Sequence, residues 1–250
     1  MNKNLSKESQ KFLDNLQIYL VSSGKNERES NEIVEELTDH LRLAESEGKS
    51  VQHIIGHSPK DYMEQLAAEM AFDKKAWIKF IVTIILGVFS YTILTRAASG
   101  NLSFSLLNVI GLTFIVALLI GAVFMMFKYI AANSLSKTKE YSLYFLYSLF
   151  SLLLFIGLIL LDQRITTPVV NFSEISTLII ALLTFAFLVA VSFWSKTWIV
   201  LIFLAFLVLP DLVLNQMSID PKTQISLSTT ITFGGIAVYL FVVTKRQKKA

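Results

Sequence analysis

The sequence predicts an all-α, polytopic membrane protein in which six transmembrane helices follow a small N-terminal cytoplasmic helical domain. Three observations lead to this fold class. Residues 1–73 are hydrophilic and acidic, six apolar segments follow residue 76, and lysines and arginines are shared unevenly among the connecting loops. Hydrophobic residues make up 54% of the chain, which excludes an ordinary soluble domain. We therefore divide the chain into residues 1–73 and 74–250.

Helix-capping residues divide the first 73 residues into four predicted helices. Ser6 and Gly24 bound the first helix, and Asn26 with Glu29 forms a capping pair at the start of the second. A short third helix covers residues 51–55. The fourth begins at Ser58-Pro59, and we expect it to run on through Phe72 toward the membrane.

The second predicted helix, which follows Asn26, has two opposite faces on a wheel of 100° per residue. Its apolar face consists of Ile33, Val34, Leu37, Leu41 and Ala44. Acidic residues occupy the other face, and Glu32, Glu35 and Asp39 are candidates for docking a basic protein partner. The alternative is an ordinary solvated face. His40, at the edge of the apolar arc, is predicted to be a packed, hydrogen-bonded structural histidine, with pH sensing as the alternative.

The apolar segments match the length that a bilayer requires. A hydrocarbon core of roughly 30 Å needs about 20 apolar residues of helix. The predicted spans cover residues 77–94, 108–127, 141–161, 175–194, 198–214 and 225–243. We expect the fifth span to be short or kinked, because its uninterrupted part ends at Pro210-Asp211.

The distribution of basic residues predicts the orientation, because cytoplasmic loops carry the excess of lysine and arginine. Eleven fall on the side of the N-terminus: Lys74, Lys75, Lys79, Lys128, Lys137, Lys139, Lys196, Lys245, Arg246, Lys248 and Lys249. Three fall on the other side: Arg96, Arg164 and Lys222. Both termini are therefore predicted to be cytoplasmic.

Three stretches of the N-terminal region resemble a known domain. They are Glu35-Glu36-Leu37-Thr38-Asp39-His40-Leu41, Glu45-Ser46-Glu47-Gly48-Lys49-Ser50, and Ile54-Ile55-Gly56 with Ser58-Pro59. Over roughly residues 8–70 the chain resembles the HAAS-type helical domain, which occurs at the N-terminus of small multi-pass proteins, mostly in Gram-positive bacteria. The resemblance implies a signalling or regulatory adaptor in a bacterial cell membrane.

The residue types argue against catalytic, metal and nucleic-acid sites. His53 and His57 are four apart, but Gly56 and Pro59 interrupt the helix that would align them, and the chain has no cysteine. The predicted spans hold no Asp, Glu, His or Arg between the membrane interfaces, which disfavours catalysis, proton relays and ion pathways. Residues 1–73 carry eight Lys and Arg against fourteen Asp and Glu, which disfavours nucleic acid as a partner.

The sequence therefore predicts a non-enzymatic membrane protein without cofactor or metal, in contact with the lipid bilayer and with a cytoplasmic or membrane protein partner. Its N-terminal domain would carry interaction or signalling. The alternative is a permease-like transport component for an apolar or uncharged substrate, and intramembrane catalysis ranks third.

Overall fold

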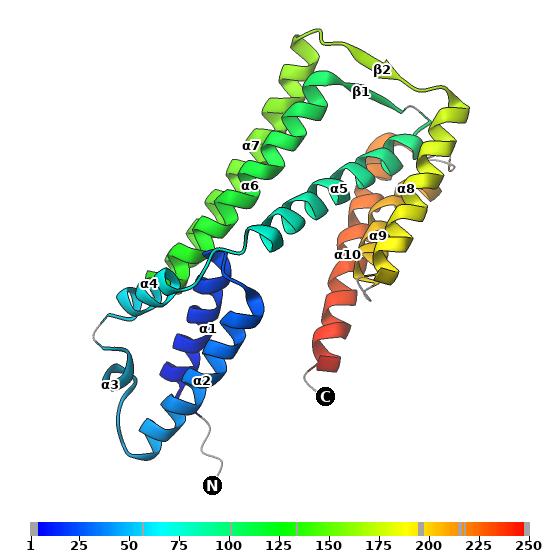
Figure 1. The fold of residues 1–250 in the computed structure, drawn as a ribbon. Coiled ribbons are helices and arrows are strands. Elements are labelled where there is room, and N and C mark those ends of the chain that lie inside the picture. The colour runs from blue at the N-terminus through cyan, green and yellow to red at the C-terminus, as the bar shows by residue number, and fades with distance from the viewer. Residues whose placement is uncertain are drawn as a thin grey trace. The chain divides into compact units, whose positions relative to one another are not determined.

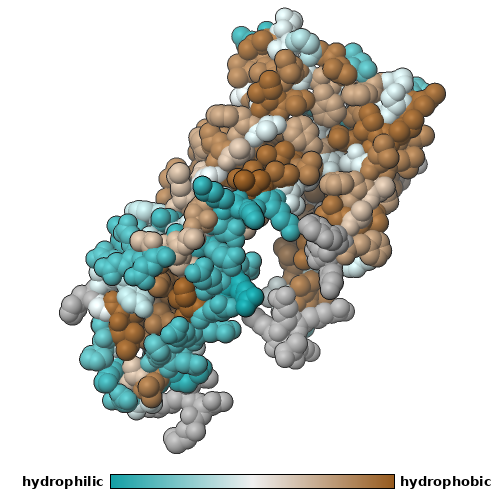
Figure 2. Space-filling view, in the orientation of Figure 1, coloured by the Kyte–Doolittle hydropathy of each residue, from teal (hydrophilic) through white to brown (hydrophobic). Residues whose placement is uncertain are grey.

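The computed structural model describes residues 5–56, 58–100, 102–133, 135–194, 198–214, 217 and 219–247. Four helices form the N-terminal part: α1 (Lys7–Ser22), α2 (Glu27–Ser46), α3 (Val51–Ile55) and α4 (Pro59–Glu69). The rest comprises α5 (Lys74–Ala98), β1 (Ser103–Ser105), α6 (Leu106–Asn133), α7 (Lys137–Arg164), β2 (Val169–Asn171), α8 (Glu174–Trp194), α9 (Ile199–Leu214) and α10 (Pro221–Gln247) (Figure 1). Figure 2 shows a hydrophilic surface over the N-terminal helices and a hydrophobic surface over the long helices.

The predicted caps of the N-terminal helices are confirmed. The Ser6 hydroxyl accepts a hydrogen bond from the Ser9 amide at 3.1 Å, and Ser58 accepts one from the Asp61 amide at 3.2 Å. Glu45 strengthens the first of these caps, because its carboxylate accepts hydrogen bonds from the Ser6 amide and the Ser9 hydroxyl. A carboxylate is favoured there by the partial positive charge of the N-terminus of α1.

The core of the N-terminal helices includes a residue from a membrane helix. Leu16, Leu20, Leu41 and Met63 are fully buried in this core. Ala131 of α6 belongs to the same cluster and is 1% exposed. A domain of about 70 residues has a marginal core of its own, so this contact adds to its stability.

The expectation that the fourth helix continues through Phe72 is wrong. Helix α4 ends at Glu69, and Lys25 and Phe72 form an isolated antiparallel bridge before α5 begins at Lys74. The bridge holds this part of the backbone extended, which is incompatible with helix. The connection to the membrane helices is nevertheless short.

Five described helices are long and apolar enough to cross a bilayer: α5, α6, α7, α8 and α10. Helix α9 is also apolar but shorter, with Leu201–Leu214 as its apolar part. The protein is thus an all-α, polytopic membrane protein with five full-length candidate spans and one short one. Helix α9 continues through Pro210 to Leu214.

The chain divides into two compact units. The first contains Met1–Thr83 and Ile110–Arg164, and the second contains Ile84–Val109 and Ile165–Ala250. In the first unit, Trp77 and Phe80 of α5 pack on Phe124 of α6, with ring centroids 4.5 and 5.6 Å apart. The Tyr147 hydroxyl of α7 donates to the Leu119 carbonyl of α6 at 3.3 Å.

The second unit contains a feature that the sequence did not predict, a two-stranded antiparallel ladder of β1 and β2. Ser103, Phe104 and Ser105 are paired with Asn171, Val170 and Val169. Arg96 at the end of α5 donates to the Ser103 carbonyl and to Asn108, and its guanidinium lies 4.7 Å from the centroid of the Phe104 ring. Strands of three residues are too short for a periodic pattern, and their partners lie in separate loops.

Candidate interaction surface on the N-terminal domain

The predicted acidic residues of α2 border an open groove of about 500 Å³ beside the start of α5. The groove is lined by Asn26, Glu27, Arg28, Asn31, Glu32, Glu35, Asp73 and Ala76, and we refer to these residues as the acidic groove. This set contains four carboxylates and one guanidinium. The groove therefore has an excess of negative charge, which complements a basic surface.

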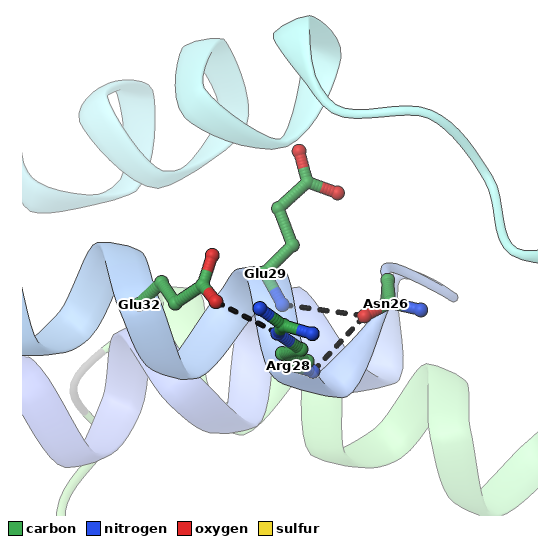
Figure 3. Close-up of polar contacts among 4 residues, drawn as sticks. All are labelled: Asn26, Arg28, Glu29 and Glu32. Carbon is green, nitrogen blue, oxygen red and sulfur yellow. Dashed lines mark hydrogen bonds and ion pairs between the residues drawn. The ribbon is translucent and has the colours of Figure 1, made fainter.

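An ion pair between neighbouring turns of α2 lies along one wall of the acidic groove. Arg28 Nε donates to Glu32 Oε1 at 2.9 Å, one turn further along the helix (Figure 3). The two side chains are 88% and 61% exposed, so this pair contributes little to stability and is free to exchange partners. The Glu29 side chain points away from this pair (Figure 3).

Asn26 and Asp73 connect the caps of two helices. The Asn26 side-chain oxygen accepts hydrogen bonds from the Arg28 and Glu29 amides, which caps α2. Its Nδ2 donates to Asp73 Oδ2 at 2.7 Å, and Asp73 Oδ1 accepts from the Ala76 amide in the first turn of α5 at 2.9 Å. The hydrogen bonds from the Ala76 amide and from Asn26 lower the pKa of Asp73. Asp73 is therefore held as a carboxylate that links α2 to α5.

Backbone contacts reinforce this connection. The Asp73 amide donates to the Gly24 carbonyl at 2.9 Å, and Lys25 Nζ donates to the Met70 carbonyl at 2.8 Å. The rings of Phe72 and Trp77 stack with centroids 5.9 Å apart and lie against Gly24, where no Cβ would fit. Gly24 also has a φ of 76°, which glycine adopts without strain.

The structure separates the three predicted docking residues. Glu32 and Glu35 line the acidic groove, whereas Asp39 lies outside it and pairs with Arg42 at 2.6 Å. All three are exposed, so they are accessible to a partner. Their proposed role in docking stays a prediction.

The expectation of a packed His40 is wrong, because His40 is exposed and its side chain forms no hydrogen bond among the described residues. The physical reason is the width of the buried stripe. Leu37, Leu41 and Ala44 are buried, but Ile33 and Val34 at the margins are only partly buried. His40, at the edge of the same arc, extends past the core into solvent.

The sequence did not identify Asn26 and Asp73 as parts of the surface. Asn26 carries a capping signal, but nothing in its pattern indicates that its amide nitrogen also binds Asp73, 47 positions away. Among the described residues, no three His, Asp or Glu side chains form a group that could hold a metal ion. Of His53 and His57, which the sequence disfavours as a metal site, His57 lies outside the described residues.

The fold defines a multi-pass α-helical membrane protein, and one comparison with known proteins finds a similar family. Residues 88–209 match the family described as the HAAS transmembrane region. This match is consistent with the prediction of a HAAS-type membrane protein. The match begins after the N-terminal helices, so the resemblance of residues 8–70 to the HAAS domain stays a prediction. No curated protein and no solved structure matches the chain.

Proposed function

We propose that the chain is a non-enzymatic regulatory protein of a bacterial cytoplasmic membrane, whose N-terminal domain binds a basic surface of a protein partner. The observation that carries the proposal is the acidic groove, in which carboxylates of α2 and of the α4–α5 connection lie around one opening. Glu32 and Glu35 supply the charge of α2, and Asp39 extends the acidic face beyond the groove.

Asp73 gives such binding a route to the membrane helices. It lines the groove and also caps α5 through the Ala76 amide. A lysine or arginine of the partner that bound Asp73 would compete with the Asn26 amide for the same carboxylate. Because Asn26 joins α2 to the start of α5, occupancy of the groove would alter the connection between the domain and its first membrane helix.

The test is capture of partners by the full chain in detergent or nanodiscs. The triple variant Glu32→Lys, Glu35→Lys, Asp39→Lys should lose the partner while the domain stays folded, because all three side chains are exposed. Binding by the wild type should also weaken with rising salt, since exposed charges are screened over roughly 10 Å at 0.1 M.

A matched control reverses three exposed acids elsewhere on the domain, Asp14, Glu64 and Glu69. It changes the net charge by the same amount and should keep the partner. Retention of the partner by the folded first variant would contradict the proposal, and equal loss in both variants would show that net charge alone is responsible.

A second candidate function, a transport component for an apolar substrate, is favoured by an apolar groove of about 760 Å³ in the second unit. The two functions differ in what deletion of residues 1–73 does. Transport would survive the deletion and fail when the apolar groove is filled, whereas regulation through the N-terminal domain would be lost with the deletion.

A further inference from the structure

We propose that the apolar groove of the second unit binds one acyl chain of a membrane phospholipid whose headgroup carries a primary ammonium group. This site is independent of the function proposed for the N-terminal domain. The groove lies among the end of α5, the first half of α8 and most of α9, and its volume of about 760 Å³ is within the range of roughly 300–1,000 Å³ typical of ligand sites.

The lining is built by two regular helical stripes. On α8 the lining residues are Glu174, Thr177, Leu178, Ala181, Leu182 and Phe185. On α9 they are Leu201, Leu204, Ala205, Val208, Leu209 and Leu212. Both sets follow the same i, i+3, i+4, i+7 spacing, so each helix presents one continuous face to the groove. The alanines within each stripe leave the space that larger side chains would fill.

The dimensions of the groove fit a lipid chain. Each stripe covers eleven helical steps, or about 16 Å at 1.5 Å per residue. This is close to half of a hydrocarbon core of roughly 30 Å, the depth that one leaflet occupies.

The polar end of the groove specifies the headgroup. Glu174 is the charged residue among the described lining residues, and it lies in the first turn of α8. Thr177 is on the same face one turn further and is 8% exposed, and its hydroxyl forms no hydrogen bond among the described residues. A phospholipid supplies matching groups: an ammonium for the carboxylate, an ester carbonyl for the hydroxyl, and a hydrocarbon chain for the remaining lining.

The end of the groove opposite Glu174 is lined by apolar residues. Phe185 and Leu201 are the last lining residues of α8 and α9 in that direction. Since the carboxylate and the hydroxyl are both at the opposite end, the ligand is oriented with its polar group there and its chain along the apolar stripes.

The experiment uses the full chain in phosphatidylcholine nanodiscs that contain a small fraction of phosphatidylethanolamine with a diazirine on its acyl chain. After irradiation and digestion, we expect the label on α8 between residues 177 and 185 and on α9 between residues 204 and 212. Ala181→Trp, which fills the groove, should reduce this labelling about tenfold, the effect of losing one well-packed chain contact. Ala186→Trp, on the exposed part of α8, should leave it unchanged.

The headgroup is tested with the same diazirine chain on phosphatidylcholine. The wild type should label roughly fivefold more with the ethanolamine lipid, the order expected for one interfacial ion pair, and Glu174→Gln should abolish this preference. In the wild type, unlabelled ethanolamine lipid should compete and unlabelled choline lipid should not. This competition needs no variant, so it remains decisive if Ala181→Trp does not fold.

Equal labelling of the Ala181→Trp and Ala186→Trp variants would overturn the proposal of a bound chain. Equal labelling of the wild type by the two lipids would overturn the assigned headgroup. Crosslinking of groove residues to a second copy of the chain in place of lipid would assign the groove to self-association and would also overturn it.

Discussion

Asn26 has two roles, because its one side chain contributes to the caps of two helices. Its oxygen caps α2 and its nitrogen binds Asp73, which caps α5. Asparagine and aspartate are about equally good N-caps, but only asparagine has a donor. The residue type at this position therefore depends on the connection to α5 as well as on the cap.

Asn26→Asp tests this interpretation. Aspartate keeps the cap of α2 but places a second carboxylate next to Asp73, so the start of α5 should open more often. We expect hydrogen exchange of the amides at residues 74–77 in the full chain to accelerate roughly five- to tenfold, the effect of losing one hydrogen bond worth about 1 kcal/mol. Exchange in the first turn of α2 should change little.

The exchanged pair Asn26→Asp with Asp73→Asn provides the control. Asparagine at position 73 can donate to the new carboxylate at position 26 and still accept from the Ala76 amide, so the double variant should recover most of the protection. Failure of the exchange to rescue protection would show that the two side chains do not act as a pair.

The same contacts predict a pH dependence. Asp73 has a folded-state pKa lowered below its ordinary value of 3.8 by the Ala76 amide and by Asn26. A depressed folded pKa means that the stabilisation is complete above the ordinary pKa and is lost as pH falls through the folded value. In a Trp194→Phe, Trp198→Phe variant, Trp77 is the remaining tryptophan. Its fluorescence should stay constant from pH 7 down to about pH 4 and change only below that pH. An Asp73→Asn chain should lack that acidic transition.

Gly24 and Gly48 form a matched pair for separating backbone strain from packing. Both have positive φ, 76° and 79°, but a Cβ at Gly24 would overlap the Phe72 and Trp77 rings, whereas Gly48 has open space. Alanine at either position should cost about 1 kcal/mol for the left-handed backbone, and Gly24→Ala should cost roughly 1–3 kcal/mol more for overpacking. The rate of tryptic cleavage after Lys25 in the full chain measures the difference. Equal rates for the two variants would exclude the packing contribution.

Helix α9 shows how a proline is accommodated inside a membrane helix. Pro210 has no amide hydrogen, so it cannot bond to the Phe206 carbonyl four residues earlier. Thr232 of α10 donates to that carbonyl at 2.8 Å. Ser228 of α10 also donates to Asp211, the residue that follows the proline. Helix α10 thus supplies hydrogen bonds to the interrupted part of α9, as unsatisfied groups in a bilayer require.

Thr232→Val removes this substitute donor. The variant should be destabilised by about 0.6–1.7 kcal/mol, since measured interhelical hydrogen bonds in a membrane protein average the lower value and reach the higher one. In a Pro210→Ala background the same change should cost much less, because the alanine amide at position 210 would bond to the Phe206 carbonyl. A double-mutant cycle from unfolding of the full chain in bicelles measures the coupling, and additive effects would contradict the assignment.

Local signals predicted the elements better than their connections. Capping residues such as Ser6 and Ser58 fixed the helix starts, because the partner amide lies within a few residues. The break after Glu69 was missed, because Lys25 and Phe72 stabilise it from positions far apart in sequence. Of the acidic groove, the charge on α2 was predictable from periodicity, whereas the contribution of Asp73 depended on the tertiary contact with Asn26.

At the scale of the whole molecule, the number of spans and the orientation depend on α9. Its 16 residues extend about 24 Å, less than a hydrocarbon core of roughly 30 Å. Local thinning of the bilayer can accommodate such a difference at modest cost. The hydrogen bond from Ser228 also reduces the cost of placing Asp211 near the end of the helix. These contacts favour a sixth crossing.

The basic residues then predict where each loop lies. With α9 as a span, the charge distribution predicts eleven lysines and arginines on the cytoplasmic side, three on the other side, and two cytoplasmic termini. Without it, the basic C-terminal tail would be outside. The chain has no cysteine, so single cysteines at positions 99, 136 and 247 can be labelled one at a time in intact cells with an impermeant maleimide. Position 99 should react from outside, and positions 136 and 247 only after the cells are opened. Reaction of position 247 in intact cells would remove α9 from the set of spans, and reaction of position 136 would invert the predicted orientation.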